Sequence, residues 1–433
     1  MMRKIALMPV VLLVLLMASL SFGKEKDKHS LPPRATSGVD HIVVVMMENR
    51  SFDHLLGWHP TANARQSGLS YPDRDGVLQP TEPLAPDYQG CSHPDPFHSY
   101  SGGRVEYAGG KMNGFLLAGT NDDYAIGFYT ESDRPFYNSL AVNYTTFDNF
   151  FSPILASTYP NRIFMHAAQT DRLDNTLDLS TLPTIWDRMN EKGVSARYYY
   201  SDVSFLWLWG NKYQANSASY EQFLADAAAG TLPSVAFVEP RLVGEAEGIS
   251  GDDHPHADIR TGDAFLAATF QAVASGPDWK HTVFIVTYDE WGGFFDHIPP
   301  PRAVAPNNVD PDLVNGKALL GMRIPVVVAS PFTRGVPDTP RVVSTVFDNT
   351  SILKLIEWRW NLKPLTARDG SDDVGNLAFA LDFDNPDATL PLIPAPLPPE
   401  PVLCSPVLLP GELSLQDLIM LAPLGVLPAP VKP

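Results

Sequence analysis

Residues 40–54 have the sequence DHIVVVMMENRSFDH, and this stretch sets the fold that we expect for the chain. The run at 42–45 is apolar and β-branched, as in a strand that is buried on both faces of a sheet. Glu48, Asn49 and Arg50 follow it closely. Because open α/β sheets build their sites at the carboxyl ends of strands, we expect Glu48 and Asn49 to hold a metal ion there.

Further along the chain, apolar strand-like runs alternate with helix-like patterns. This alternation predicts a doubly wound, mainly parallel α/β sheet with helices on both faces. Residues 57–101 are rich in Pro, Asp, Gly and aromatics, which indicates a loop-rich excursion over the active-site edge rather than a linker. The expected strands lie within 196–200, 232–240, 281–293 and 324–331, and the expected helices within 136–144, 182–193, 263–274 and 350–360.

The first 23 residues have the three parts of a secretory signal peptide. Arg3 and Lys4 are followed by an apolar stretch at 5–16, and small residues precede a cleavage site that we expect after Gly23. The mature chain would then be secreted, to the periplasm or the medium. The alternative is a retained membrane anchor, for which the apolar stretch is short. No later stretch is long and apolar enough to cross a bilayer.

The remaining chain is expected to form one α/β domain at 24–384 and a Pro-rich tail at 385–433. The tail would pack on the domain surface, with a short apolar helix at 413–421; an interaction segment is the alternative. Cys91 and Cys404 are the only cysteines. In an exported protein they could pair and tie the tail to the body, although their positions in the sequence do not show that they meet.

The charge balance limits the partners. The formal net charge is −18, or −20 without Arg3 and Lys4. Nucleic acid is excluded as the partner because phosphate contacts need a surplus of Lys and Arg, and tight adsorption to anionic membranes is disfavoured as well. A phosphate ester in a local pocket is still compatible, since a metal ion there outweighs the field of the surface.

A second strand end carries acidic residues, in YDEWGGFFDH at 288–297. If its strand is a parallel neighbour of the first, Asp289 and Glu290 share an edge with Glu48, and a cation is needed to offset their repulsion. Gly292 would let the backbone approach a ligand closely. The alternative is that the acidic pair caps a helix or pairs with arginines. Oxygen ligands alone suit Ca²⁺, Mg²⁺ or Mn²⁺, whereas added histidines favour Zn²⁺.

A hydroxyl and several histidines complete the set of candidates. STYPNR at 157–162 places a hydroxyl after an apolar stretch, where a metal ion would lower its pKa and make it a nucleophile; an ordinary turn is the alternative. His98, His254 and His297 lie in expected loops near acidic residues and could contact phosphoryl oxygens or protonate a leaving oxygen. Surface or packing roles are the alternative for each, and His256 competes with His254.

Eight motifs occur in order and together resemble a known family, the bacterial phosphoesterases that include phosphatidylcholine-type phospholipase C enzymes and a group of acid phosphatases. The resemblance extends over about residues 40–383. The motifs are ENRSFDH (48–54), DPFHS (95–99), GGKMNGF (109–115), STYPNR (157–162), DHPHADIRTGDAF (253–265), TYDEWGGFFDHIPPP (287–301), RIPVVVASPFTRG (323–335) and DNTSILKLIEWRWNL (348–362).

This resemblance implies an alkaline-phosphatase-like fold and a metal-dependent phosphoesterase domain with one divalent ion, Zn²⁺, Ca²⁺, Mg²⁺ or Mn²⁺. Thr158 falls where the family has its metal-bound nucleophile, with Ser157 as a rival because Ala156-Ser157 departs from the usual GPTxPNR pattern. The implied metal ligands are Glu48, Asn49, Thr158, Asp289 and Glu290, and the implied phosphoryl or leaving-group contacts are His98, His254 and His297.

The resemblance also implies a mechanism and a substrate class. Thr158 would attack phosphorus to give a phosphothreonine, His254 would protonate the departing alkoxide, and water would then release the phosphoryl group. The expected enzyme is a phospholipase C that cleaves phosphatidylcholine-type lipids during transient contact with a lipid surface. The alternatives are a broad acid phosphatase for phosphomonoesters and, in a different class, a non-catalytic secreted binding protein.

Overall fold

The structure is a computed structural model that describes residues 30–245, 247–404 and 413–424. Contacts divide the chain into a unit of residues 1–31 and a second unit of Pro32–Pro433, and every helix and strand below lies in the second. The expected signal peptide at 1–23 lies outside the described residues. The domain boundaries expected at 23 and 384 stay predictions.

An eight-stranded sheet organises the second unit, with the strand order β13-β4-β12-β9-β1-β8-β6-β7. Five of its seven neighbouring pairs are parallel, and only the pairs of β12 with β4 and β9 are antiparallel. The prediction of a mainly parallel sheet is therefore confirmed. Its strands are β1 (His41–Met47), β4 (Thr145–Phe147), β6 (Ala196–Tyr200), β7 (Ser217–Ser219), β8 (Val235–Val238), β9 (Thr282–Tyr288), β12 (Val326–Ala329) and β13 (Arg341–Val343).

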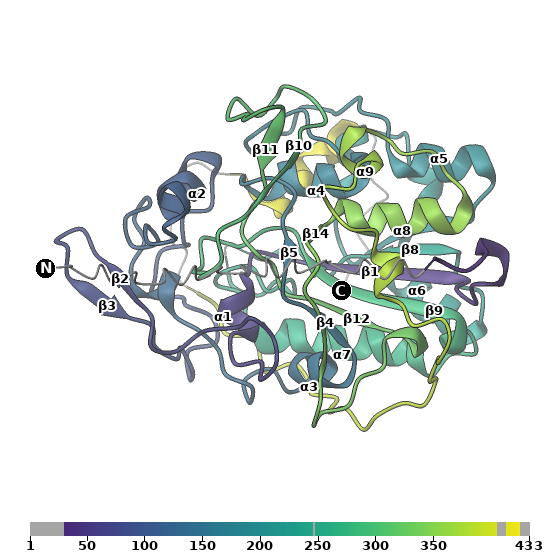
Figure 1. The fold of residues 1–433 in the computed structure, drawn as a ribbon, viewed down its shortest axis with the longest axis horizontal. Coiled ribbons are helices and arrows are strands. Elements are labelled where there is room, and N and C mark those ends of the chain that lie inside the picture. Colours follow the sequence, from purple (N-terminus) through teal and green to yellow (C-terminus); the bar gives the residue numbers. More distant parts are fainter. Residues whose placement is uncertain (1–29, 246, 405–412, 425–433) are drawn as a thin grey trace, which may run out of the picture. The chain divides into compact units, whose positions relative to one another are not determined.

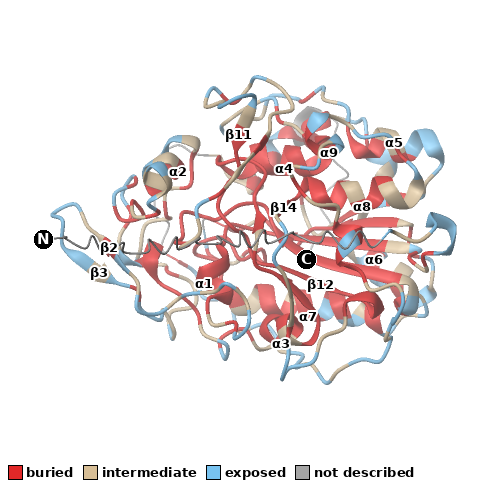
Figure 2. Ribbon diagram, viewed as in Figure 1, coloured by how far each residue is buried: buried red, intermediate tan, exposed pale blue. Residues whose placement is uncertain are grey.

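Helices cover both faces of this sheet (Figure 1). On one face lie α3 (Pro135–Asn143), α6 (Tyr220–Ala229) and α7 (Ile259–Ala274). On the other lie α4 (Thr158–Ala167), α5 (Ile185–Lys192), α8 (Thr350–Trp360) and α9 (Ala367–Gly370). This layering buries β1 and β9 on both sides, as Figure 2 shows for the centre of the sheet.

The predicted elements are close to the observed ones, with three differences. The helix expected at 263–274 begins at Ile259, because Asp258 caps it through a hydrogen bond from the N–H of Arg260. The excursion at 57–101 holds a small hairpin of β2 (Ser70–Pro72) and β3 (Leu78–Pro80). A helix that the sequence analysis treated as part of a turn, α4, begins at Thr158.

Shorter elements connect these layers. They are α1 (Phe52–Leu56), α2 (Tyr100–Tyr107), the pair β5 (Phe150–Phe151) and β14 (Phe347–Asp348), the pair β10 (Arg302–Val304) and β11 (Lys317–Leu319), and two 3₁₀ helices, η4 (Phe205–Trp209) and η9 (Leu415–Leu424).

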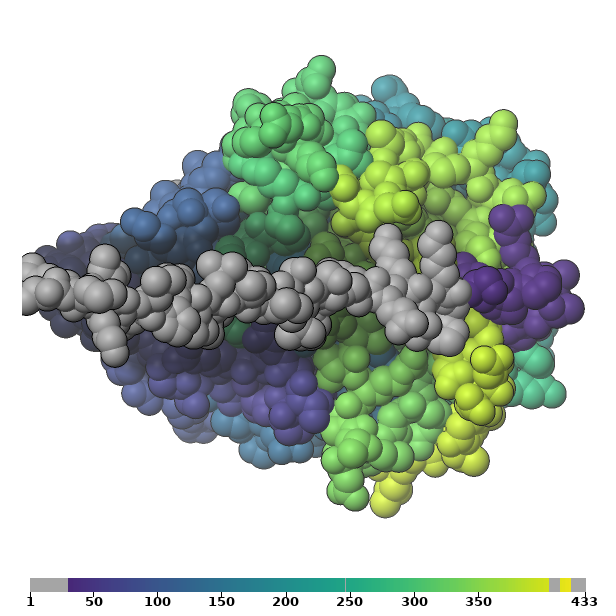
Figure 3. Space-filling view, viewed as in Figure 1, coloured from purple at the N-terminus to yellow at the C-terminus, as the bar shows by residue number. Residues whose placement is uncertain are grey.

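Two described parts of the segment after residue 384 contact the rest of the second unit. Trp279 donates a hydrogen bond from Nε1 to the carbonyl of Ala388, 3.0 Å away, and a disulfide joins Cys91 to Cys404. On the face shown in Figure 3, the start of the second unit lies beside the segment after α8, where Arg34 Nη1 donates to Asn361 Oδ1 at 2.7 Å. Among the described residues, none of the helices has the length and apolar character needed to span a bilayer.

Candidate active site

The carboxyl ends of three neighbouring strands meet at one edge of the sheet. β1 lies between β9 and β8, and all three are parallel. Met47 of β1 is in register with Tyr288 of β9, so the residues that follow the two strands emerge side by side. These residues are Glu48 and Asn49 after β1, and Asp289 and Glu290 after β9, all of them buried.

Asn49 turns the chain sharply after β1. Its φ of 57° lies in the left-handed region, which asparagine tolerates better than most residues. Its N–H donates to Asp289 Oδ1 at 3.2 Å. Gly292 packs against this turn, because a Cβ there would lie 2.1 Å from the Asn49 carbonyl oxygen. Gly292 thus lets the backbone approach Asn49, and its expected approach to a ligand stays a prediction.

Thr158 is the first residue of α4 and points its hydroxyl at this turn. Ser157 precedes the helix in an extended conformation, and Pro160 lies in the first turn, where its missing N–H costs no hydrogen bond. Asn161 fixes the approach to the helix by donating from Nδ2 to the carbonyl of Ala156 at 2.6 Å. The Thr158 hydroxyl donates to Asn49 Oδ1 at 3.4 Å, which joins α4 to the end of β1.

The acidic pair after β9 is held mainly by backbone donors. Asp289 Oδ1 accepts from the N–H of Glu290 at 2.7 Å, in addition to the bond from Asn49. Glu290 Oε2 accepts from the N–H of Gly292 at 2.7 Å. The other oxygen, Glu290 Oε1, is buried and receives no hydrogen bond from any described residue; His98 Nε2 lies 3.7 Å from it.

Arg162 is the functional candidate that the sequence analysis missed. Its guanidinium is buried and lies 2.9 Å from Glu48 Oε1, 2.6 Å from Glu239 Oε1 and 3.0 Å from Asp289 Oδ2. The alternative in which Asp289 pairs with an arginine is thus present in the structure. One guanidinium faces three carboxylates, so it cannot neutralise all of them. The charges of this edge call for a further cation.

His98 orients the Asn49 amide. Its Nδ1 donates to the Pro96 carbonyl at 2.6 Å, so its Nε2 is the acceptor for Asn49 Nδ2 at 3.3 Å. With its nitrogen engaged by His98, the amide turns its oxygen toward the Thr158 hydroxyl. The backbone and the imidazole together fix which atom of Asn49 is available to a cation.

His254 lies next to His98, with ring centroids 6.0 Å apart. Arg50 holds its loop by donating from Nε to the carbonyl of Asp253 at 2.6 Å. Burial lowers the pKa of His254 to about 4. His256, the competing histidine, instead contacts the carbonyl of His93 through Nε2 at 3.0 Å.

His297 lies in a different cluster. Its Nδ1 makes a short contact with Asp53 Oδ2, and its Nε2 is 3.2 Å from Asn63 Oδ1. Arg323 completes this cluster through Nη2 to Asp53 at 3.0 Å and Nε to Asp296 at 2.9 Å. The contacts that the structure gives His297 do not join it to Glu48, Asp289 or Thr158 within the described chain, so its catalytic role stays a prediction.

The residues at the strand ends fit a divalent cation. Burial raises the pKa of Glu48 and Glu290 well above the usual value and also raises that of Asp289. An ion among these carboxylates would offset that cost, and the unbonded Glu290 Oε1 and the Asn49 Oδ1 are oxygen donors suited to it. Glu48, Asn49, Asp289 and Glu290 thus offer oxygen ligands of the kind that the resemblance implies, although Glu48 and Asp289 also pair with Arg162, and their role as a metal shell stays a prediction.

Two groups of acidic and histidine side chains at this edge have ligand atoms that all lie within 4.8 Å of one another, and Asp53, Asp296 and His297 form such a group elsewhere. The two at this edge are Glu48, Glu245 and His254, and Asp95, His98 and His254. The second would bring imidazoles to the ion, which favours Zn²⁺, whereas the oxygen set favours Ca²⁺, Mg²⁺ or Mn²⁺. The sequence could have indicated both residues of the ion pair between Arg162 and Glu239. Glu239 directly follows the apolar run at 235–238, and Arg162 is the last residue of the STYPNR motif at 157–162.

Comparisons with known proteins agree with this geometry. Residues 39–363 match the model of the Phosphoesterase family. The chain is 32% identical to non-specific phospholipase C1 of Arabidopsis thaliana over 79% of this chain and 71% of that protein. It is 30% identical to phospholipase C A of Mycobacterium tuberculosis over 84% of this chain and 81% of that protein.

Among solved structures, the fold is similar to a protein of the alkaline phosphatase superfamily from Vibrio parahaemolyticus. The TM-score is 0.40 with 11% identity, over 80% of this chain and 72% of that one. The family match itself covers the strand ends, α4 and the histidine loops described above. The chain therefore belongs to the Phosphoesterase family and is a hydrolase that acts on phosphoric ester bonds.

Proposed function

We propose that the protein is a secreted, divalent-cation-dependent phospholipase C that cleaves phosphatidylcholine-type lipids, with Thr158 as its nucleophile. The observation that carries the proposal is the contact of the Thr158 hydroxyl with Asn49 Oδ1, 3.4 Å away, beside the carboxylates that follow β1 and β9. Phospholipase C relatives that match most of the chain support the substrate class.

In this proposal Glu48, Asn49, Asp289 and Glu290 hold the cation. When bound, the ion would lower the pKa of a neighbouring hydroxyl and offset negative charge on phosphoryl oxygens. Arg162 keeps Glu48 and Asp289 in place through its two ion pairs. α4 orients the Thr158 hydroxyl for attack on phosphorus: the new bond gives a phosphothreonine, the bond to the leaving oxygen breaks, and the hydroxyl proton passes to water. A water molecule then hydrolyses the phosphothreonine, which releases the phosphoryl group and restores the hydroxyl.

His254 is proposed to protonate that leaving oxygen. With a pKa of about 4, the buried imidazole is neutral at neutral pH; Nδ1 donates the ring's one proton to the Pro255 carbonyl at 3.0 Å, so Nε2 carries no proton to give before substrate binds. A phosphate ester brings negative charge next to the ring, which raises its pKa and favours the protonated form. His98 donates from Nδ1 to the Pro96 carbonyl and is proposed to orient the Asn49 amide.

A paired assay tests the substrate class. Purified protein is given p-nitrophenylphosphorylcholine and p-nitrophenyl phosphate, each with Zn²⁺, Ca²⁺, Mg²⁺ or Mn²⁺ in turn. We expect the choline diester to be cleaved with the higher kcat/KM. A preference for the monoester would show that the protein is an acid phosphatase and not a phospholipase. Cleavage of phosphatidylcholine in vesicles is the corresponding test on a lipid substrate.

Secretion is part of the same proposal. The Cys91–Cys404 disulfide supports it, because such bonds persist in oxidising compartments. Sequencing the amino terminus of protein recovered from the medium and the periplasm tests it. A mature protein that begins after Gly23 is expected, and one that retains residues 1–23 would contradict it.

A further inference from the structure

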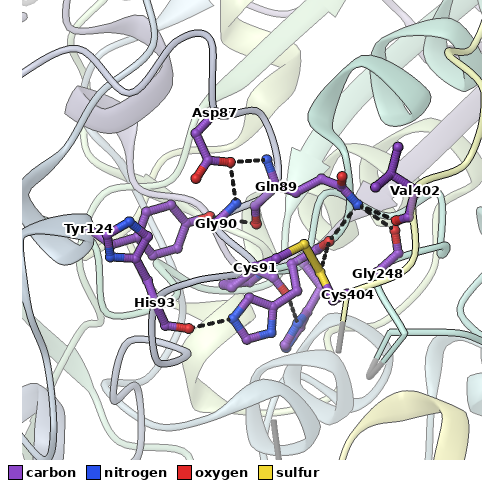
Figure 4. Close-up of a disulfide and its surroundings, with 12 residues drawn as sticks. Asp87, Gln89, Gly90, Cys91, His93, Tyr124, Gly248, Val402 and Cys404 are labelled. Carbon is purple, nitrogen blue, oxygen red and sulfur yellow. Dashed lines mark hydrogen bonds between the residues drawn. A yellow bond between two sulfur atoms is a disulfide. The ribbon is translucent and has the colours of Figure 1, made fainter. Parts of the chain in front are cut away.

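The tail is fastened to the body close to the His254 loop. In Figure 4 the disulfide between Cys91 and Cys404 lies beside Gln89, whose Nε2 donates to the carbonyls of Gly248 at 3.0 Å and Val402 at 2.9 Å. Cys404 also donates its N–H to the carbonyl of Glu247 at 3.0 Å. The body segment at 87–91, the loop at 247–256 and the tail therefore meet at one point.

The same body segment pairs directly with the histidine loop. The N–H of His256 donates to the carbonyl of Gln89 at 2.9 Å, and that of Ile259 donates to the carbonyl of Tyr88 at 3.1 Å. His254 lies two residues before His256 in this loop. The disulfide is thus placed at the base of the loop that carries a candidate catalytic histidine.

Beyond the disulfide, the chain returns as a docked segment that we call the C-terminal segment, residues 413–421. Its side chains at Leu415, Leu418 and Leu421 are buried. The N–H of Gly244 donates to Gln416 Oε1 at 3.2 Å, and η9 packs on η4. The burial of these three leucine side chains holds the segment against the domain.

Two carbonyls of the C-terminal segment hold the residue that follows the nucleophile. Tyr159 Oη donates to the carbonyl of Ser414 at 2.8 Å. Asn175 Nδ2 donates to the carbonyl of Leu413 at 2.7 Å, and Asn175 Oδ1 accepts from the N–H of Tyr159 at 2.8 Å. Both ends of Tyr159 are therefore tied, directly or through Asn175, to the C-terminal segment.

We propose that the C-terminal segment is a positioning element of the active site: it fixes the start of α4, and hence the Thr158 hydroxyl, and the Cys91–Cys404 disulfide keeps it in place. The proposal rests on Thr158 as the nucleophile. Eight residues separate Cys404 from the first residue of the segment, a span of at most about 30 Å. Such a short tether keeps the segment at a high effective concentration near its docking site.

Oxidation state then controls activity. A trialkylphosphine reduces the disulfide by giving two electrons to the sulfurs; each sulfur leaves as a thiol with one proton, and the phosphine takes up the oxygen of one water as its oxide. Without the bond, the segment is held only by its non-covalent contacts. If the Thr158 hydroxyl loses its alignment, kcat falls more than the affinity for substrate does, because alignment matters most in the transition state.

Tyr159→Phe is the sharpest test, because it leaves the disulfide intact and keeps the ring that packs edge-on against Phe205. We expect kcat to fall about five- to tenfold, KM to change less than twofold and Tm to stay the same. Tyr220→Phe is the matched control: its hydroxyl contacts Thr269 at 2.9 Å, away from this segment, and no change is expected. A kcat for Tyr159→Phe within twofold of wild type would overturn the proposal.

The disulfide is tested in parallel with the Cys91→Ser/Cys404→Ser double variant and with phosphine-treated wild type. Both should lose kcat about tenfold and show faster amide exchange at 413–421, while reoxidised wild type recovers. Unchanged kcat in the fully reduced protein, with thiols confirmed by mass spectrometry, would contradict the tether. Thr158→Ala separates the two proposals. If that variant keeps its activity, the assignment of the nucleophile is wrong. If it is inactive while Tyr159→Phe has normal kcat, only the proposal of a positioning element is wrong.

Discussion

Two buried acidic clusters are built from the same two stretches of chain, and they differ in how their charges are met. The strand-end cluster (Glu48, Asp289, Glu290 and Glu239 around Arg162) comes from residues 48–49, 239 and 289–290. The clamp cluster (Asp53, Asp296 and His297 around Arg323) comes from residues only a few positions later, 53 and 296–297. The carboxylates of both clusters are buried, whereas His297 is partly exposed.

In the clamp cluster every carboxylate oxygen has a donor. Asp53 Oδ1 accepts from Arg323 and from the N–H of Arg65, and Oδ2 accepts from His297. Asp296 Oδ1 accepts from Arg323 and Oδ2 from the N–H of Asp53. With all four oxygens satisfied, this cluster joins segments that are far apart in the chain. The ligand atoms of Asp53, Asp296 and His297 also lie within 4.8 Å of one another, so the cation experiment below compares the two clusters directly.

In the strand-end cluster some buried carboxylate oxygens have no hydrogen-bond donor within the described chain. Glu290 Oε1 has no donor among the described residues, and Glu48 Oε1 lies within ion-pair distance of Arg162 without a hydrogen bond. Burial raises the pKa of both carboxyls well above the usual value. Of two similar buried acidic clusters, the one better suited to a cation is the one in which carboxylate oxygens outnumber hydrogen-bond donors, here the strand-end cluster.

The largest expected effect is on catalysis at the strand-end cluster. Thr158→Ala removes the hydroxyl that contacts Asn49 and should lower kcat at least about 1,000-fold, with Tm unchanged because the side chain is small. Steady-state assay with the phosphorylcholine diester measures it. Ser157→Ala is the control for the rival hydroxyl and should keep most activity. If instead Ser157→Ala is the inactive variant, the roles of the two residues are exchanged.

The next effect is on stability at the clamp cluster. Arg323→Met leaves Asp53 and Asp296 buried together without their guanidinium and should lower the free energy of unfolding by about 3–5 kcal/mol. Urea unfolding followed by circular dichroism measures it. Lys212→Met breaks an exposed pair with Asp187 and should cost less than about 1 kcal/mol. Equal losses in the two variants would show that the clamp is not specially stabilising.

Cation binding separates the two clusters directly. After treatment with EDTA, adding the preferred ion at about 100 times its Kd should stabilise the protein by about 2.7 kcal/mol. Asp289→Asn should abolish this gain and lower the metal content, because it removes a strand-end carboxylate. Asp296→Asn should retain the gain even if its baseline Tm is lower. A gain that survives in Asp289→Asn but not in Asp296→Asn would assign the ion to the clamp.

The smallest effect concerns a buried carboxyl outside both clusters. Burial raises the pKa of Glu357 from 4.5 to about 10, with a smaller contribution from Asp369. The folded protein therefore keeps this proton over a range where the unfolded chain has lost it, and stability falls as pH rises through that window. Glu357→Gln, which has no proton to lose, should have a higher Tm than wild type at pH 9 and an equal Tm near pH 4. Thermal unfolding at the two pH values measures the difference, and equal Tm values at pH 9 would contradict it.

Much of the fold could be predicted because its signals are local. The apolar run at 42–45 and the run before Tyr288 are long enough to specify buried strands, and Gly193 ends α5 at a φ of 68° that favours glycine. Polar residues directly after those strands pointed to the site edge, since parallel strands must share it. The start of α4 at Thr158 was missed because Pro160 resembles a turn signal although a first helical turn accepts it.

The sequence by itself determined the strands, the helices and the residues that emerge at the sheet edge, because these depend on neighbours a few positions away. Only the tertiary structure decided which acidic residues receive an arginine. Arg323 is 270 positions from Asp53 in the chain, and Arg162 is 127 positions from Asp289. It likewise brought Cys91 to Cys404 across 313 positions. Pairings of buried charges and thiols depend on distances between remote segments, which no local pattern contains.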